Sequence, residues 1–310
     1  MSSIGMPRQS SALFWLLFEA YIRRTQKKNA MFRYVLRKYH EFRQWLSPLV
    51  VSRFKSGVVF NAFLAYESRL VSMKPDLMEF VDKKGHKFYA CRSVLINTFK
   101  YGWDLRVKRL QGYYGVNALK FRDNSVVVDI GANIGEFGNY YLRHAGIKNT
   151  TLISFEPDPV EFVCLEKNNK DPRSFNCNKA LWSKRETLTL YHKNDFGDTS
   201  LIKPPGHVSE SSIDVSTLDH EIEVLNIFEK HECIDLIKIE AEGAEPEIIS
   251  GGLNTIGKTR YVVVDCGPER GLRKETTVVS VVGQMIEINF ELINFIPGRY
   301  ALLFKNTKLD

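Results

Sequence analysis

The sequence predicts an α/β protein whose mostly parallel seven-stranded sheet carries helices on both faces and ends in an antiparallel hairpin. Two observations predict this fold. From residue 125 onward, short apolar runs rich in β-branched residues alternate with segments of helical periodicity, as in a parallel sheet covered by helices. The last two runs are joined by only four residues, 296–299, and such a short connection forces the two strands to be antiparallel.

Each element can be placed on the sequence. We expect strands at 125–130, 151–156, 174–180, 235–240, 261–266, 290–295 and 300–305. We expect helices at 136–144, 159–169, 218–231, 244–251 and 275–289. The alternating segment 186–192 predicts an additional edge strand. The segment 194–216, with its Gly, Pro and Ser residues, predicts a long irregular stretch that is a lid, a binding loop or disordered.

Composition divides the chain into three segments. With 310 residues, of which 44% are hydrophobic, the chain can form one substantial core and an appendage. We assign 1–60 to a basic amphipathic helical extension, 61–124 to a lead-in or cap region, and 125–310 to the main α/β domain. Within the lead-in, 87–91 predicts a strand and 103–110 a helix.

The net charge of +7 is unevenly distributed. Residues 1–60 carry eleven Lys or Arg and two Glu, a net charge of +9, so the rest of the chain sums to −2. The α/β part is therefore nearly neutral, which argues against a site there that binds a polyanion such as a nucleic acid. The five cysteines have no C-x-x-C spacing, which predicts free thiols in a reducing, cytoplasmic location.

The N-terminal extension contains two apolar segments. Residues 12–18 are too short to span a bilayer and do not resemble a signal peptide. Over 31–46, apolar residues recur at spacings of three and four opposite a basic face, which predicts an amphipathic helix. Two interpretations are open. Residues 11–46 contact the inner face of a membrane peripherally, or the apolar stripe docks onto the main domain or onto a second subunit in a homodimer.

The stretch 125–156 has the pattern of a nucleoside-cofactor site. Its first strand ends in Asp129, a turn with Gly131 and Gly135 follows, and the second strand ends in Glu156. A carboxylate directly before the turn repels a pyrophosphate and attracts a cation. S-adenosylmethionine (SAM) has a sulfonium, an ammonium and no phosphate, so it fits this turn better than a dinucleotide.

The predicted cofactor contacts follow from the position of each residue. We predict that SAM is bound by Asp129, Gly131, Asn133, Gly135, Glu156 and Ala180. Glu156 is placed to bind the ribose hydroxyls, and Ala180 follows the third strand, where the adenine of such a cofactor lies. For Asp129 the alternative is a carboxylate that caps the following helix.

Five blocks occur in order along roughly residues 120–300: VVVDIGANIGEFG, SFEPDPVEFVCLEKN, STLD, IDLIKIEAEGAEPEIISGG and VVVDCGPERG. Together they resemble the FkbM family of SAM-dependent methyltransferases. The resemblance implies a class I Rossmann-like methyltransferase fold and O-methylation of a hydroxyl, in relatives often on a sugar or a polyketide-type scaffold. The family's usual K-I-D-x-E-G block reads KIEAEG at 238–243, so the acid is kept but its side chain is one methylene longer.

Methyl transfer to a hydroxyl requires alignment of the acceptor oxygen and removal of its proton. We predict Glu240 and Glu242 as catalytic bases whose pKa partial burial raises toward neutrality, although Glu242 could instead stabilise the following helix N-terminus. We predict that Asp265 and Arg270 shape the acceptor pocket, with a surface salt bridge as the alternative for Arg270. The histidines lack metal-binding spacing, so we expect no metal.

Three functions compete on the sequence alone. The favoured one is an O-methyltransferase acting on a glycan or another small-molecule acceptor. An RNA methyltransferase could use the basic N-terminal arm to track phosphates, but no N-P-P-Y-type tetrapeptide follows the fourth strand. The third is a non-catalytic SAM-binding protein.

Overall fold

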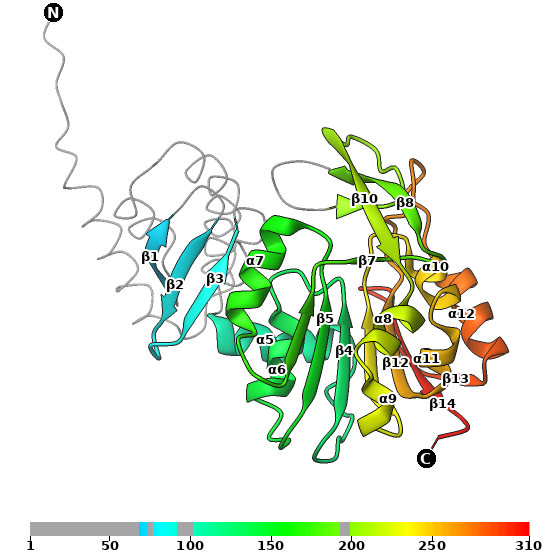
Figure 1. The fold of residues 1–310 in the computed structure, drawn as a ribbon, viewed down its shortest axis with the longest axis horizontal. Helices are drawn as coiled ribbons and strands as arrows, with labels where there is room; N and C mark the ends of the chain where they lie inside the picture. Colours follow the sequence, from blue (N-terminus) through cyan, green and yellow to red (C-terminus); the bar gives the residue numbers. More distant parts are fainter. Residues whose placement is uncertain (1–67, 74–76, 92–101, 193–198, 310) are drawn as a thin grey trace, which may run out of the picture. The chain divides into compact units, whose positions relative to one another are not determined.

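The computed structural model describes residues 68–73, 77–91, 102–192 and 199–309 (Figure 1). The chain divides into two compact units, Met1–Ala65 and Tyr66–Asp310, and all described residues belong to the second. The predicted extension at 1–60 therefore lies outside the described residues. Within the described ranges, no helix combines the length and the apolar character needed to cross a membrane.

A seven-stranded sheet with the order β13-β14-β12-β11-β4-β5-β6 forms the centre of this unit. Its strands are β4 (Val126–Ile130), β5 (Thr151–Phe155), β6 (Ser174–Cys177), β11 (Ile234–Ile239), β12 (Thr259–Asp265), β13 (Phe290–Ile296) and β14 (Ala301–Asn306). Neighbouring strands from β12 to β6 are parallel, whereas β14 is antiparallel to both β12 and β13. The predicted fold is confirmed.

The central strands are buried because their sequences are apolar on both faces. Every residue of β4 and β11 is buried, and the two strands pair in parallel with Ile237 opposite Val128. Neighbouring residues of β4 enter different hydrophobic clusters, Val126 on one face of the sheet and Val127 on the other. Burying one such side chain contributes about 1.5–3 kcal/mol. This packing fixes the carboxyl ends of β4 and β11 next to each other.

Helices cover both faces of the sheet (Figure 1). They are α5 (Trp103–Tyr113), α6 (Glu136–Arg143), α7 (Pro159–Asn168), α8 (Leu218–Val224), α9 (Ile227–Lys230), α10 (Glu245–Ser250), α11 (Leu253–Gly257) and α12 (Val278–Glu287). Leu110 of α5 and Phe137 of α6 pack with Val127, whereas α8, α10 and α12 pack in the cluster on the other face. The helix predicted at 218–231 is divided at Asn226, whose φ of 52° is not helical.

A second sheet of four strands corrects three predictions. Its order is β7-β10-β8-β9, with β7 (Ala180–Leu181), β8 (Glu186–His192), β9 (Thr199–Ser200) and β10 (Ser209–Ser216). The strand predicted at 186–192 exists but lies between β10 and β9, so it is not an edge strand. The prediction of an irregular stretch at 194–216 is wrong over β10, which is a strand that pairs with β8. Its mostly polar, exposed side chains lack the apolar pattern that identifies a strand. The strand predicted at 174–180 is divided between β6 and β7.

The described residues before β4 include a small antiparallel sheet and α5. The sheet has the order β1-β2-β3, with β1 (Ser68–Met73), β2 (Met78–Asp82) and β3 (Lys87–Ala90). The strand predicted at 87–91 and the helix predicted at 103–110 are confirmed. The Asn168 side chain attaches β3 to α7, because it accepts a hydrogen bond from the backbone N–H of Tyr89 and donates one to its carbonyl.

Candidate active site

A cavity of about 280 Å³ lies at the carboxyl ends of β4, β5 and β11. Six predicted site residues line it: Gly131, Asn133, Glu156, Ala180, Glu240 and Glu242. Four predicted site residues are not in its lining: Asp129, Gly135, Asp265 and Arg270. The lining also contains four cations that are not among the predicted site residues: Arg106, Lys179, Lys238 and Arg299.

The turn after β4 is shaped by its glycines. Gly131 has a φ of +71°, and a Cβ atom there would lie 1.8 Å from the carbonyl oxygen of Glu240. Only glycine avoids both the strained backbone conformation and this clash. Gly135, with a φ of +89°, precedes α6, and a Cβ there would lie 2.8 Å from the Asn169 side chain. Main chain rather than side chains therefore forms this part of the cavity wall.

Glu156, at the end of β5, is held in place by the backbone. Its Oε2 accepts a hydrogen bond of 2.7 Å from the N–H of Asn133, and its Oε1 accepts one of 2.9 Å from the N–H of Asp158. Glu156 is buried, and burial raises its pKa to about 7. Each carboxyl oxygen keeps a lone pair, so the group can still accept hydrogen bonds from a diol.

Asp129 lies beneath the cavity and acts through its neighbours. Its Oδ2 accepts a hydrogen bond of 3.1 Å from the backbone N–H of Gly138 in α6, and its Oδ1 forms an ion pair with Lys238. Asp129 is 0% exposed. The structure thus shows the helix-anchoring contact that we considered as the alternative, and it adds an ion pair to Lys238.

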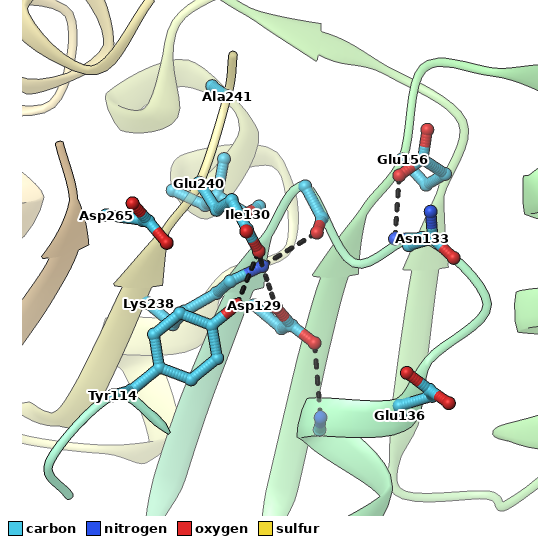
Figure 2. A network of polar contacts seen from close by, with 12 residues as sticks. Tyr114, Asp129, Ile130, Asn133, Glu136, Glu156, Lys238, Glu240, Ala241 and Asp265 are labelled. Atoms are coloured by element: carbon cyan, nitrogen blue, oxygen red, sulfur yellow. Dashed lines mark hydrogen bonds and ion pairs between the residues drawn. The ribbon is translucent and has the colours of Figure 1, made fainter. Parts of the chain in front are cut away.

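Lys238 of β11 is the centre of a polar network (Figure 2). Its Nζ donates to the carbonyl oxygens of Gly131 and Ile130 at 2.7 and 3.2 Å, and it lies 3.2 Å from Asp129 and 3.1 Å from Glu240. Burial alone would lower the pKa of Lys238, but the two carboxylates outweigh burial and raise it. The lysine therefore stays charged and connects the cofactor turn to the end of β11. A lysine within an apolar strand is the sequence signal that could have identified it.

Glu240 follows β11 and receives two contacts on one oxygen. Its Oε2 accepts a hydrogen bond of 2.5 Å from the Tyr114 hydroxyl and lies 3.1 Å from the Lys238 Nζ. Burial works to raise the pKa of Glu240, but the charge of Lys238 and the hydrogen bond from Tyr114 outweigh it, so the pKa lies below its ordinary value. We expected a raised pKa here. That prediction was wrong because the sequence did not place Lys238 and Tyr114 beside this carboxylate.

Residues 129–296, more than half of the chain, match the family model described as methyltransferase FkbM domain. The chain belongs to the FkbM methyltransferase family. It is 25% identical over 207 residues to the 2-O-methyltransferase NoeI of Sinorhizobium fredii, covering 61% of this chain and 82% of that protein. It is 26% identical over 151 residues to Methyltransferase 1 of Beauveria bassiana, covering 42% of this chain and 59% of that protein.

A solved FkbM methyltransferase from Methylobacillus flagellatus aligns with a TM-score of 0.44 and 18% identity. That alignment covers 62% of this chain and 47% of the solved one, so this chain spans about half of its length. Membership in the FkbM family makes the protein a SAM-dependent methyltransferase, with SAM as its cofactor.

The residues around the turn fit this cofactor. The cavity wall carries the carboxylates of Glu136, Glu156 and Glu161, of which Glu136 is paired with Arg106 at 2.9 Å, and no Lys or Arg lies within the turn itself. Acids suit the sulfonium and ammonium groups of SAM, and they do not suit a pyrophosphate. The missing Cβ at Gly131 leaves room for a ligand against the main chain.

The rim beyond Glu240 carries further acids at the ends of β11 and β12. Burial raises the pKa of Asp265 to about 7, and burial together with Glu242 and neighbouring acids raises that of Glu269 to about 8. Asp265 lies beside Glu240 in the FkbM domain (Figure 2). Glu242 lines the cavity with a φ of 50°, and its carbonyl accepts a hydrogen bond from Ser200 of β9.

Arg270 is paired with an acid of α10. Its two Nη atoms lie 2.8 and 2.6 Å from the carboxylate oxygens of Glu247, and Nη1 also donates to the carbonyl oxygen of Gly243. This bidentate arrangement is a strong one for a guanidinium. The structure therefore favours the salt bridge that we considered as the alternative to an anion-binding role.

Asp82, His86 and Asp104 are near enough to one another to hold a metal ion, but they lie on the β2–β3 hairpin and α5. Arg143 Nη1 lies 2.9 Å from His86 Nε2. The carboxylates already have protein partners: Asp82 Oδ1 accepts from the backbone N–H groups of Lys84 and His86, and Asp104 pairs with Lys84 at 2.8 Å. We assign no metal to this cluster.

Proposed function

We propose that this FkbM methyltransferase transfers the methyl group of SAM to a hydroxyl of a sugar, a glycan or another small-molecule acceptor. The Glu240 carboxylate carries the proposal, because its contacts with Tyr114 and Lys238 both use Oε2. Oε1 is therefore available, on a residue that lines the cavity, to accept a hydrogen bond from an acceptor hydroxyl. The relative NoeI, whose name states 2-O-methyl transfer, supports a hydroxyl acceptor.

Gly131, Asn133, Glu156 and Ala180 would hold the cofactor. Glu156 accepts hydrogen bonds from the ribose hydroxyls, and the backbone at Gly131 supports the methionine part. Ala180 is buried in the cavity wall after β6 and offers an apolar surface to the adenine. Asp129 and Gly135 support this site from below, through the helix that follows the turn.

Glu240 orients the acceptor hydroxyl and receives its proton on Oε1. SAM, when bound, would supply the electrophilic methyl group and would leave as SAH. A carboxylate of low pKa suffices, because the acceptor oxygen becomes strongly acidic only as it gains the methyl group, so its proton leaves late. Lys238 and Tyr114 keep the carboxylate ionised and fix its position. Glu242, our second predicted base, would contact the acceptor from the β9 side of the cavity.

The proposal is tested by incubating the protein with SAM and a panel of simple glycosides and non-sugar alcohols. Formation of S-adenosylhomocysteine (SAH) is followed, and the products are analysed by mass spectrometry. We expect SAH to form with at least one alcohol and the product to carry the new methyl group on oxygen. Methylation of RNA, with every alcohol inert, would contradict the proposal.

A further inference from the structure

Arg299 is a cation at the cavity that the proposed mechanism does not use. It belongs to the four-residue connection between β13 and β14, is exposed, and lines the cavity. Its Cζ lies 5.1 Å from the centroid of the Tyr113 ring, a cation–π contact that holds the guanidinium in place. In the described part of the chain, no carboxylate lies within ion-pair distance of this guanidinium.

Two acids near Arg299 act on it from beyond ion-pair distance. Its positive charge lowers the pKa of both Glu240 and Asp265, so the guanidinium lies near both carboxyl groups. Glu240 shares the single charge of Lys238 with Asp129. Burial raises the pKa of Asp265 to about 7 and that of Glu269 to about 8, so both groups carry less than a full negative charge near neutral pH. An anion that approaches Arg299 therefore meets less repulsion from these two acids than from two ionised carboxylates.

Arg299 lies on the acceptor side of the cavity. The strand order β5-β4-β11-β12-β14 places the start of β14 four strands from Glu156, which is roughly 19 Å at about 4.8 Å per strand. A cofactor with its ribose at Glu156 extends toward Glu240, and Arg299 lies beyond Glu240 in the strand order.

We propose that Arg299 binds an oxyanion of the acceptor, so that the substrates of this enzyme are acidic sugars or glycans carrying a carboxylate, sulfate or phosphate. A guanidinium that contacts an aromatic ring keeps its N–H donors available to such a group. The proposal rests on the proposed function, because it assigns the acceptor to that same cavity. It adds the chemical class of the acceptor and the residue that selects it.

The test compares glycosides that differ only in one charged group. Methyl glucuronide is paired with methyl glucoside, and methyl galacturonide with methyl galactoside; glucose 6-phosphate and 6-sulfate are each paired with glucose. Binding to the SAH-loaded enzyme is measured for each member by calorimetry, and kcat/KM is measured by SAH release. We expect the anionic member of at least one pair to bind about tenfold or more tightly.

Arg299→Gln removes this preference in the proposed account. We expect the affinity and kcat/KM of the variant to fall about tenfold or more for the anionic member and less than about twofold for its neutral partner. A hydrogen-bonded charge pair is lost only in the first case. Its Kd for SAH stays unchanged. Arg273→Gln, at an exposed arginine of a neighbouring turn, is the matched control and keeps the preference.

Several results would overturn the proposal. Equal binding within every pair removes the anionic substrate class. A tenfold loss of SAH affinity in Arg299→Gln would mean that the residue binds the cofactor carboxylate instead. Equal losses of affinity for both members of a pair would mean that its role is structural. Binding of a short RNA that depends on Arg299 places the anion in a nucleic acid. A failure of the proposed function looks different, because anionic glycosides then bind the SAH-loaded enzyme but none becomes methylated.

Discussion

The Lys238 ammonium lies 3.2 Å from the Asp129 carboxylate, and the two side chains are 2% and 0% exposed. They belong to β11 and β4, which are adjacent in the sheet although more than a hundred residues separate them in sequence. Lys238 also donates a hydrogen bond to the carbonyl oxygen of Gly131 and forms an ion pair with the carboxylate of Glu240. One buried lysine therefore aligns the cofactor turn with the residue that we place at the acceptor.

Lys238→Met should be strongly destabilising. The substitution leaves Asp129 buried without its cation, and breaking a buried pair from one side costs about 3–5 kcal/mol. Urea unfolding followed by circular dichroism measures the change in unfolding free energy. Lys170→Met, at an exposed lysine, serves as the control and should change this free energy by less than about 0.5 kcal/mol. A loss of under 1 kcal/mol in Lys238→Met, about the value of a surface pair, would show that the pair does not hold the strands together.

Gly131→Ala should abolish cofactor binding or prevent folding. The new Cβ would lie 1.8 Å from the backbone carbonyl of Glu240, and neither main chain can move without opening the β4–β11 pairing. Gly283→Ala in α12 is the matched control, because no atom lies within 4 Å of the new Cβ, and replacing a helical glycine gains about 0.5–1 kcal/mol. Thermal unfolding and SAH calorimetry check both variants. Normal SAH affinity in Gly131→Ala would contradict the structure of the turn.

Above the pKa of about 7, where Glu156 is ionised, Glu156→Gln should weaken SAH binding by about ten- to a hundredfold, because hydrogen bonds from the ribose to a charged acceptor contribute about 1.5–3 kcal/mol. Isothermal titration with SAH measures the effect. Glu166→Gln, on the exposed side of α7, should leave the affinity unchanged. If Glu156→Gln binds SAH as tightly as the wild type, the ribose lies elsewhere and our placement of the cofactor is wrong.

The buried carboxyl of Asp265 should make stability depend on pH. Burial raises its pKa to about 7 in the folded protein, against about 3.9 in an unfolded chain. Between these values the folded state binds more protons than the unfolded state, so the contribution of Asp265 to the unfolding free energy falls as pH rises, by at most about 1.4 kcal/mol per pH unit.

Asp265→Asn removes this proton equilibrium. Its unfolding free energy relative to the wild type should therefore rise between about pH 5 and pH 7. Urea unfolding at several pH values within this window measures the difference. Asp214→Asn, at an exposed aspartate, should give a difference that does not vary with pH. A constant difference for Asp265→Asn would show that Asp265 is ionised throughout the window.

Much of the fold could be predicted because its signals are local. The apolar run of β4 and the short connection before β14 identify a parallel centre and an antiparallel end without knowledge of any long-range contact. β10 could not be recognised in the same way, because most of its serines and acids face solvent and it is a strand through its pairing with β8 and β7.

The cofactor half of the site was easier to predict than the acceptor half. Gly131 and Glu156 stand at fixed positions after consecutive strands, so one motif identifies both. Lys238 and Arg299 contribute to the site only through the order of the strands, which places β11 beside β4 and β14 beside β12. The lowered pKa of Glu240 could not be predicted for the same reason, since its partners Tyr114 and Lys238 come from two other parts of the chain.

The central claim is that Glu240 serves the acceptor hydroxyl while a separate set of residues holds the cofactor. Its most direct test is a comparison of Glu240→Gln with the wild type. Both proteins receive an accepted alcohol and SAM with a trideuterated methyl group. The labelled O-methyl product is measured by mass spectrometry, and SAH affinity is measured by calorimetry. We predict that Glu240→Gln loses about a hundredfold or more of the turnover, within the range of general base catalysis, and keeps its SAH affinity within about twofold. Equal turnover in the two proteins, or a loss of SAH affinity that matches the loss of turnover, would contradict the claim.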